Sequence, residues 1–559
     1  MNHPIESLLR KRILILDGGM GTMIKSYRLK EIDFRGNRFV NHSSNLKGNN
    51  DLLSITQPKI VTEIHNAFLD AGSDIIETNT FSSTFISQAD YKLENIVYEL
   101  NFEAAKIARI AADKKTNQTP EKPRFVAGAI GPTKYNASLS PNTKDSSFRN
   151  INFDTLVIAY SEALHGLVDG GIDVILVETV FDTLNSKAAI YAIKKYFNDH
   201  GTQLPVMISG TIIDSSGKTL SGQVPEAFWN SIAHARPISV GFNCALGANE
   251  LREHIESISS LVDVNVSVYP NAGHLNKSGE YDHTPQRMAK LIQEFAASGL
   301  VNLVGGCCGA TPEHIRAIAN AVSDKAPRTL PKKTNHFRLA GVEPLNFNEN
   351  ISIAKIGERI NISGSATSAK LLDEEKIKKA LKIAQAQVKH GNQIIEINVS
   401  DSLINGEELI TKLLNLFAAE PDVSRVPVIL ASRKIAINLA GLKCIQGKAI
   451  VSSISLKDGE KSFIVSTREI LLFGAALVIL PYDENGKAEN YNHMISIFLR
   501  AYKILTNIVG FAPQNIILDT NIDNNSDIKK QADLSGRVIS KTNKFKKLMP
   551  IEMIIEKKY

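Results

Sequence analysis

Three of the four cysteines in this chain stand where their thiols could act together: Cys244 and the adjacent pair Cys307 and Cys308. Each follows a short apolar segment, 239–243 or 301–305, that is expected to be a strand. Three thiolates form a soft ligand set that suits tetrahedral Zn²⁺, and three protein ligands with an open fourth position are typical of catalytic zinc. Zinc can deprotonate an incoming thiol at neutral pH, although a free thiol has a pKa of about 8.5. The cysteines therefore predict a zinc centre that prepares a substrate thiol to attack an activated carbon.

Two other interpretations of these cysteines remain open. The Gly-Gly-Cys-Cys-Gly segment at 305–309 could be a tight turn with two buried cysteines. A redox pair is also conceivable, but adjacent cysteines close a strained ring and lack the two-residue spacer of thioredoxin-like sites. The fourth cysteine, Cys444, lies far along the chain in Gly-Leu-Lys-Cys-Ile and is expected to pack in a core. Placement after two separate strands favours a metal site.

The first 325 residues alternate short apolar segments with longer amphipathic ones. The amphipathic segments repeat apolar residues at three- and four-residue spacing, as in Ile60, Ile64, Ala67 and Phe68, which is typical of helices. Eight strand-then-helix units in one run match a (β/α)8 barrel in number and order, with a doubly wound sheet as the alternative. The expected strands are 13–17, 74–79, 125–130, 173–178, 205–210, 239–243, 264–269 and 301–305.

Polar residues gather at the ends of these expected strands. In a (β/α)8 barrel the carboxyl ends of the strands form one face, and active sites lie on that face. Side chains from several strands should therefore meet above the barrel. The residues that we single out are Gly19, Met20 and Thr22 after the first strand, Glu77 and Asn79 at the second, Glu178 at the fourth and Asn243 at the sixth.

A second strand–helix series comes after the barrel. Residues 326–350, with Pro327 and Pro331, are typical of a linker. Six strands are expected after it, at 351–356, 393–398, 427–431, 449–454, 476–481 and 515–519. Six strands do not close an eight-stranded barrel. The predicted fold class is therefore α/β, with an N-terminal TIM barrel at 1–325 and a second, incomplete TIM-barrel-like domain at 351–523.

Composition narrows the class of protein. Of 559 residues, 43% are hydrophobic and 22% are charged, as in a soluble globular protein. The net charge is +6, and residues 524–559, with nine Lys/Arg and four Asp/Glu, carry +5 of it as a basic polar tail. The rest of the chain has no basic excess that would indicate nucleic acid as a partner. No apolar run reaches the roughly 20 residues that span a bilayer, and the N-terminus is unlike an export signal, so a cytoplasmic protein is expected.

Several motifs at the strand ends carry a family likeness. The chain resembles the homocysteine S-methyltransferases, and within that family it is most similar to the cobalamin-dependent methionine synthases. The resemblance runs through nearly all of residues 6–325. The segments that carry it are Asp17-Gly18-Gly19-Met20-Gly21-Thr22, Glu77-Thr78-Asn79-Thr80-Phe81, Glu178-Thr179, Asn243-Cys244-Ala245-Leu246-Gly247 and Gly305-Gly306-Cys307-Cys308-Gly309, together with 46–53 and 148–151.

The resemblance implies a methyltransferase that acts on homocysteine. Zinc would lie on Cys244, Cys307 and Cys308, with the homocysteine sulfur as fourth ligand, and the product would be methionine. Glu77 and Glu178 would bind the substrate amino group, and Asn243 and the Gly18–Thr22 turn its carboxylate. The donor implied is methylcobalamin, recharged from 5-methyltetrahydrofolate. Since no cobalamin-binding motif is found in the chain, the cofactor would be supplied in trans, free or on a separate cobalamin-binding protein.

The second domain resembles the folate-binding barrel that comes next in the same family, on 357–365, 441–448 and 500–506. Three departures bear on that likeness. Ala431 stands where the family has a pterin-facing carboxylate, Ser452 replaces an asparagine, and Glu396 replaces an aspartate. A buried polar group without its partner destabilises binding by about 1–3 kcal/mol, so a degenerate folate site is expected. Its expected residues are Ser363, Gly364, Ser365, Asn398, Ser452, Asp519 and Asn521.

Two further functions stay open at this point. A homocysteine methyltransferase that takes its methyl group from a sulfonium or betaine donor would have the same cysteines, but it would lack the folate-like second domain. A non-catalytic zinc-binding remnant would explain the incomplete second domain and Ala431, but not the intact set of cysteines and strand-end polar residues in the first.

Overall fold

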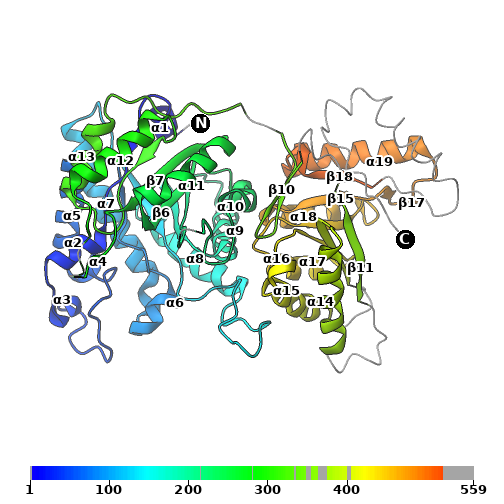
Figure 1. The fold of residues 1–559 in the computed structure, drawn as a ribbon. Helices are drawn as coiled ribbons and strands as arrows, with labels where there is room; N and C mark the ends of the chain where they lie inside the picture. The colour runs from blue at the N-terminus through cyan, green and yellow to red at the C-terminus, as the bar shows by residue number, and fades with distance from the viewer. Residues whose placement is uncertain are drawn as a thin grey trace. The chain divides into compact units, whose positions relative to one another are not determined.

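The structure is a computed structural model that describes residues 3–519, except 215, 278, 280, 333–334, 348–353, 363–373 and 400–404. The chain divides into two compact units (Figure 1). The first comprises residues up to Ala137 and Ile151–Lys332, and the second comprises Ser138–Asn150 and the residues after Lys332. The expected tail at 524–559 lies outside the described residues.

The first unit is the expected eight-stranded parallel barrel. The sheet order is β1-β8-β7-β6-β5-β4-β3-β2, and a parallel bridge between Leu16 and Ile75 joins its two ends. The fold class predicted from sequence is thus confirmed. The strands are β1 Leu14–Ile15, β2 Ile75–Glu77, β3 Phe125–Ile130, β4 Val174–Val180, β5 Val206–Gly210, β6 Ser239–Gly247, β7 Asn265–Asn271 and β8 Leu303–Val304.

Helices surround the barrel strands (Figure 1). Several begin at a proline, whose missing N–H and fixed φ suit the first helical turn: α5, α10, α12 and α13. The Asn152 and Thr284 side chains accept bonds that cap α8 and α12. The helices are α2 Met20–Ser26, α3 Glu31–Arg35, α4 Leu53–Thr56, α5 Pro58–Ala71, α6 Phe85–Gln88, α7 Val97–Gln118, α8 Phe153–Asp169, α9 Thr183–His200, α10 Pro225–Ile232, α11 Ala248–Leu261, α12 Pro285–Ala297 and α13 Pro312–Val322.

A short helix before the barrel, α1 (Pro4–Leu9), packs against the amino-terminal end of the barrel. Ile5 and Leu9 are fully buried in one apolar cluster with strand residues that include Leu14, Phe125 and Val174. These strand residues lie at or near the amino ends of β1, β3 and β4. The amino-terminal end of the barrel is therefore packed with side chains, and an opening to solvent is left to the carboxyl ends.

The second unit is built on a six-stranded parallel sheet of order β11-β12-β13-β14-β15-β18. Its strands are β11 Ile356–Ile362, β12 Ile394–Val399, β13 Val428–Ala431, β14 Ile450–Ile454, β15 Ala476–Ile479 and β18 Ile516–Leu518, with a small hairpin of β16 Tyr482–Asp483 and β17 Gly486–Lys487. Its helices are α14 Glu374–Lys389, α15 Gly406–Ala418, α16 Pro421–Ser424, α17 Ile435–Leu442, α18 Gly459–Leu472 and α19 Tyr491–Lys503, which continues as a π-helix over Ile504–Val509. An open sheet of six described strands agrees with the expected incomplete barrel.

Two expectations for the second unit need correction. The strand expected at 351–356 is displaced: β11 begins at Ile356, and 351–353 lie outside the described residues. The stretch 326–350, expected to be a linker, contains an antiparallel hairpin of β9 (Arg338–Ala340) and β10 (Pro344–Asn346). Phe337, Leu339 and Phe347 of this stretch pack against Ile394 and Ile450 in the core of the sheet. Apolar residues at every second position are typical of such strands, whereas the prolines and lysines before them are typical of a linker and led to the linker prediction.

Specific bonds also fix one segment of the expected linker and one loop of the expected first domain. Arg328, which is 5% exposed, donates hydrogen bonds to the carbonyls of Ser259, Val262 and Val264 at the end of α11. The loop Ser138–Asn150, which comes after β3 in sequence, groups with the second unit. There Arg149 donates to the carbonyl of Asn415 at 2.9 Å, and the Asn415 amide donates to that of Ser147 at 3.1 Å.

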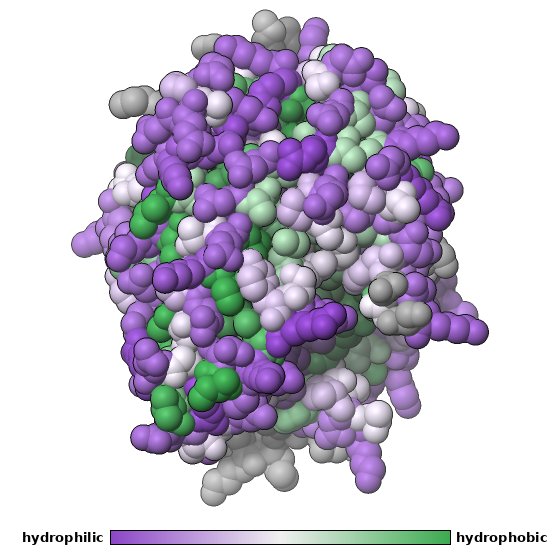
Figure 2. All heavy atoms as spheres, turned by 90° about the vertical axis from the view of Figure 1, so that its left-hand side faces the viewer, coloured by the Kyte–Doolittle hydropathy of each residue, from purple (hydrophilic) through white to green (hydrophobic). Residues whose placement is uncertain are grey.

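Figure 2 shows one face of the molecule, on which hydrophilic side chains cover most of the surface and hydrophobic ones form small scattered groups. Among the described residues, no helix is both long and apolar enough to pass through a bilayer.

Replacing Arg328 by alanine is expected to destabilise the first unit by about 3 kcal/mol, because buried carbonyls lose their donors. The measurement is urea unfolding followed by tryptophan fluorescence. The chain has one tryptophan, Trp229, which is buried in α10 and so reports on this unit alone. Lys325→Ala removes a nearby cation paired only with its neighbour Asp324 and should shift the free energy of unfolding by less than about 0.5 kcal/mol. Equal effects of the two changes would contradict the anchoring role.

The first unit should lose stability in acid through His65. This residue of α5 is 0% exposed, neither ring nitrogen has a partner among the described residues, and burial lowers its pKa to about 4. The unfolded chain, with a histidine pKa near 6.5, binds the proton more tightly, so stability falls as the pH drops from about 6.5 to 4, by up to about 3 kcal/mol. The Trp229 assay should show that the free energy of unfolding of His65→Leu rises relative to that of wild type as the pH falls across this window. A difference that is the same at pH 7 and pH 4.5 would contradict the assignment.

Candidate metal centre

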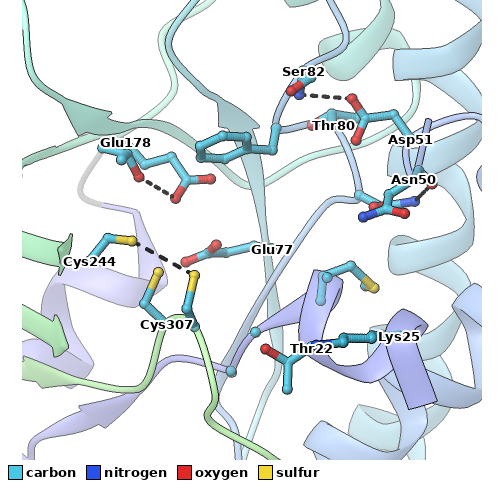
Figure 3. Close-up of a pocket in the computed structure, with 18 of the residues that line it drawn as sticks. Thr22, Lys25, Asn50, Asp51, Glu77, Thr80, Ser82, Glu178, Cys244 and Cys307 are labelled. Carbon is cyan, nitrogen blue, oxygen red and sulfur yellow. Dashed lines mark hydrogen bonds between the residues drawn. The ribbon is translucent and has the colours of Figure 1, made fainter. Parts of the chain in front are cut away.

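A cavity of about 980 Å³ opens at the carboxyl ends of the barrel strands (Figure 3). Most of the predicted site residues line it, and they come from widely separated parts of the chain: Gly19, Met20, Thr22, Glu77, Asn79, Glu178, Cys244, Cys307 and Cys308. Asn243 is the one predicted residue of the first unit that does not line the cavity. The predicted polar and sulfur side chains are thus brought together, as the barrel geometry required.

The three cysteines form one cluster. The Sγ atoms of Cys244 and Cys308 are 3.8 Å apart, and the Sγ atoms of all three residues lie within 4.8 Å of one another. All three thiols are free and half-buried. A disulfide would need a separation of about 2.05 Å, so the cluster is in the reduced form. Cys444 belongs to the second unit, where its thiol donates to the carbonyl of Ala440.

A break in strand regularity places Cys244. The pairing of β6 with β7 shifts between Asn243, opposite Tyr269, and Gly247, opposite Asn271, so β6 carries two extra residues in a bulge. Cys244 and Ala245 within it have φ of 57° and 50°, a left-handed conformation that is uncommon for residues other than glycine. A bulge re-aims side chains. It directs the Cys244 thiol towards the pair that comes after β8.

The N–H groups of the pair are bonded to two consecutive residues at the end of β7. The Cys307 N–H donates to the carbonyl of Pro270 at 2.8 Å, and the Cys308 N–H donates to the side-chain oxygen of Asn271 at 3.2 Å. The next residue, Gly309, has φ of 82°, and a Cβ there would lie 2.3 Å from the Tyr281 ring. Only glycine fits, which explains the Cys-Cys-Gly sequence.

The cluster fits zinc in both chemistry and spacing. Zn–S bonds of about 2.3 Å at a tetrahedral centre place neighbouring sulfurs about 3.8 Å apart, which is the separation of Cys244 and Cys308. Three sulfurs are soft donors of the kind that select zinc or copper(I) over magnesium or calcium. A group of three ligands that could hold a metal ion is therefore present at the cavity wall.

The thiols share negative charge unequally. Hydrogen bonds from Cys244 and Cys307 lower the pKa of Cys308 to about 3, and the Tyr281 hydroxyl adds to this effect. Hydrogen bonds to Cys244 and Cys308 raise the pKa of Cys307. The cluster therefore carries a thiolate at neutral pH, and a thiolate is the form that binds a metal.

Carboxyl groups lie beside the sulfurs. Glu77 points its carboxyl towards the cysteines, and Glu178 reaches the cavity from β4 (Figure 3). Burial raises the pKa of Glu178 to about 7, and the charge on Cys308 adds to the rise. Burial also raises the pKa of Glu77 and of Asp17, and the nearby charge of Glu178 adds to the rise of each pKa. So many acids in one cavity favour a cationic ligand group, because a positive charge there lets them ionise.

The turn after β1 forms another wall of the cavity. Helix α2 begins at Met20, and its N-cap residue, Gly19, has no side chain to bond the first-turn N–H groups. Such amides suit an anion. The Thr22 hydroxyl accepts a bond from the Gly309 N–H at 2.9 Å and so ties this turn to the cysteine loop. The Asn79 amide donates to the carbonyl of Asn50 at 2.8 Å and to the Ser54 hydroxyl at 3.2 Å.

Asn243 lies behind the cavity wall and is 0% exposed. Its side-chain oxygen accepts bonds from the Ser209 hydroxyl and the Thr179 N–H. Its amide donates to the Thr179 hydroxyl at 2.8 Å and to Cys307 Sγ at 3.9 Å. Its polar atoms are engaged with the protein, so the expected contact with a substrate carboxylate does not fit this arrangement.

Sequence reasoning missed several residues that line the cavity. Asp17 directly precedes the predicted glycine turn, and its carboxyl accepts the Glu77 N–H at 3.0 Å. Asp51 accepts bonds from the Ser82 N–H and the Ser83 hydroxyl, and burial raises its pKa to about 7. Tyr269 and Tyr281 also line the cavity. Placement near the ends of β1 and β7 could have indicated Asp17 and Tyr269, whereas Tyr281 lies in a long loop without a local signal.

The expected pterin-site residues can be followed only in part. Along one row of the second sheet, Asn398 pairs with Ala431, and Ala431 pairs with Ser452. Asn398 is exposed, Ser452 is half-buried, and the Asp519 N–H donates to the carbonyl of Ile479 beyond β18. These four positions lie at the carboxyl ends of their strands. Ser363, Gly364, Ser365 and Asn521 lie outside the described residues.

A (β/α)8 barrel with a three-thiol cluster and buried carboxyls at its mouth defines a class of barrel enzymes that act on a thiol substrate. Comparison with known families then identifies it. The family described as homocysteine S-methyltransferase matches residues 14–322, more than half of the chain. The chain therefore belongs to the homocysteine S-methyltransferase family, whose activity is methyl transfer to homocysteine.

The second unit matches a different family. Residues 357–555 match the family described as pterin binding enzyme, and this match extends through most of the segment expected to be a tail. Among solved structures, the chain is similar to the homocysteine methyltransferase MmuM from Escherichia coli. The metallated form has 21% identity and the oxidised form 20%; for each, the similarity covers 57% of this chain and 99% of that protein, with a TM-score of 0.45.

Replacing Cys307 by alanine is expected to abolish zinc binding, because two thiolates remain of a three-ligand set. Wild type loaded with zinc and then dialysed should retain one equivalent by plasma mass spectrometry, and the variant less than about a tenth of that. Cys444→Ala is the matched control, since that cysteine belongs to the second unit and is not one of the three grouped ligands, and it should retain the wild-type amount. Stoichiometric zinc in the Cys307 variant would refute the ligand assignment.

Proposed function

We propose that this protein transfers a methyl group to the thiolate of homocysteine and forms methionine, as a zinc-dependent methionine synthase of the cytoplasm. One observation carries the proposal. The three sulfur atoms, with one pair at the spacing of a tetrahedral edge, line the same cavity as the carboxyls of Glu77 and Glu178. A thiol and an amino group of one small molecule would therefore meet matching partners in one place.

The cysteines would hold the metal. Cys244, Cys307 and Cys308 leave one position of a tetrahedral ion open. A bound zinc ion supplies a Lewis acid that lowers the pKa of a thiol in that position into the neutral range. The substrate sulfur then forms its bond to the methyl carbon while the bond between that carbon and the donor breaks, and the donor keeps the electron pair.

The remaining cavity residues would bind the two ends of homocysteine. Glu77 and Glu178 accept hydrogen bonds from its ammonium group, whose charge offsets the crowding of buried acids. The N–H groups that begin α2, which the N-cap residue Gly19 does not bond through a side chain, would bind its carboxylate. Met20 and Asn79 complete the wall, and Thr22 keeps the turn against the cysteine loop. Asn243 supports the site from behind.

The methyl donor is the second part of the proposal. The match to the pterin binding enzymes favours 5-methyltetrahydrofolate as the source of the methyl group, with methylcobalamin, free or on a separate protein, as the carrier between the two units. Asn398 and Ser452 would face the pterin, with Asp519 following β18, two strands away from β14. Ser363, Gly364, Ser365 and Asn521 are assigned to the same site from sequence alone.

One observation favours a different donor. Ala431 stands between Asn398 and Ser452 and places a methyl group in the row where a pterin would find its hydrogen-bond partners. If the pterin site is weakened, a sulfonium or betaine compound is the second candidate donor. The other alternative is a protein that binds zinc without catalysing a reaction.

The test supplies zinc-loaded protein and homocysteine with one donor at a time: methylcobalamin, 5-methyltetrahydrofolate, S-methylmethionine or betaine. Methionine is measured by mass spectrometry against a reaction without protein. Methylcobalamin is expected to give methionine at a rate at least about tenfold above background, and zinc-free protein is expected to give none. Turnover with S-methylmethionine alone would reverse the order of donors, and no turnover with any donor would refute catalysis.

A further inference from the structure

We propose that Asn243 and Thr179 form a spacer that fixes the distance between the sulfur cluster and the carboxyl of Glu178, and so selects the thiol substrate by the length of its chain. The inference rests on the proposed function, in which the sulfur cluster receives the thiol and Glu178 receives the ammonium group. Neither spacer residue would touch the reacting atoms. Both are positioning residues.

A continuous path of hydrogen bonds joins the two ends of the site. The Asn243 amide donates to Cys307 Sγ at 3.9 Å and to the Thr179 hydroxyl at 2.8 Å. The Thr179 hydroxyl donates to a carboxyl oxygen of Glu178 at 3.3 Å. One carboxamide and one hydroxyl therefore connect a metal-ligating sulfur with a substrate-facing carboxyl.

The path joins two places where the barrel strands are irregular. Thr179 has φ of 53° and comes directly after Glu178 in a bulge of β4, where the pairing with β5 shifts between Val177 and Val180. Asn243 precedes Cys244, which has φ of 57°, at the start of the bulge in β6. Bulged segments lack the regular ladder that fixes strand spacing. The side-chain bonds between Asn243 and Thr179 replace it across the intervening strand β5.

A carboxamide is the group that can make this connection. The Asn243 oxygen accepts from the Thr179 N–H at 3.2 Å and from the Ser209 hydroxyl at 2.7 Å, while its amide group makes the two donations. All four hydrogen-bonding positions of the side chain are therefore used, and the side chain is 0% exposed. A buried network that is fully satisfied is rigid.

Rigidity at this place has a consequence for specificity. Homocysteine has two methylene groups between its α-carbon and its sulfur, and cysteine has one. With the Glu178 carboxyl and the sulfur cluster held at a fixed separation, chains of different length cannot bridge the two ends equally well. A site that relaxes should accept the shorter thiol more readily. The spacer therefore predicts that discrimination between homocysteine and cysteine depends on Thr179 and Asn243.

The test measures binding of each thiol to the cobalt(II)-loaded protein by the change in the sulfur-to-cobalt absorption bands. Wild type is expected to bind homocysteine more tightly than cysteine. Thr179→Val removes the connecting hydroxyl and keeps the shape, so the ratio of the two dissociation constants should fall by about tenfold. Thr179→Ser restores the hydroxyl and should return the ratio to within about threefold of wild type.

Thr183→Val is the matched control. Thr183 is also 0% exposed, and its hydroxyl donates one buried hydrogen bond, to the side chain of Gln223 at 2.7 Å, away from the cavity lining. This variant should lose thermal stability but keep the wild-type ratio. If Thr179→Val does not fold, Asn243→Asp serves instead, because it keeps the acceptor for Ser209 and the Thr179 N–H and loses the donors on the path.

The outcomes separate the two proposals. A wild-type ratio in Thr179→Val, or in Asn243→Asp, would overturn the spacer and leave the proposed function standing. A fall in the ratio that Thr183→Val shares would also overturn it, since any loss of stability would then produce the effect. A wild-type protein whose cobalt bands respond to neither thiol would refute the proposed function, and the spacer with it.

Discussion

The site depends on the convergence of two strand ends that are not neighbours in the barrel. β6 and β8 are separated by β7, yet the sulfurs of Cys244 and Cys308 lie 3.8 Å apart. The convergence requires the bulge in β6 and two consecutive residues in the left-handed region, each of which costs about 1 kcal/mol or more. On the other side, bonds to Pro270 and Asn271 fix the pair after β8. The ligand geometry is thus set by the backbone before any metal is bound.

Charge is the second organising feature of the cavity. Asp17, Glu77 and Glu178 are buried close together, and each has a raised pKa. Acids kept partly neutral in this way accept a cationic ligand by ionising, which couples binding of an ammonium group to loss of a proton. The cysteines, by contrast, already carry negative charge without a cationic ligand, because the pKa of Cys308 is lowered and the cluster shares a thiolate. The two halves of the site are therefore suited to different ends of one amino acid.

The residues at the strand ends could be predicted from the sequence, but the backbone shape of those ends could not. Eight apolar segments of ordinary length predicted the barrel, and the rule that active sites lie at the carboxyl ends brought Glu77, Glu178 and the cysteines to one face. The bulges at Thr179 and Cys244 arise from long-range pairing with β5 and β7, and nothing in the local residues indicates them. For that reason Asn243 was placed in the cavity rather than behind it. In the second unit, the alternation of Phe337 and Leu339 indicates a strand, but the core that they enter is formed by strand residues distant in sequence, such as Ile394 and Ile450.

Helix α1 has a consequence for access to the sulfur cluster. Ile5 and Leu9 are buried among strand residues at the amino-terminal end of the barrel, so that end is closed by packed side chains. The cysteines and Glu178 line a cavity at the opposite, carboxyl-terminal end. A molecule that reaches the sulfurs therefore approaches from the side of the loops after the strands. The packed floor thus gives the site a single-ended shape.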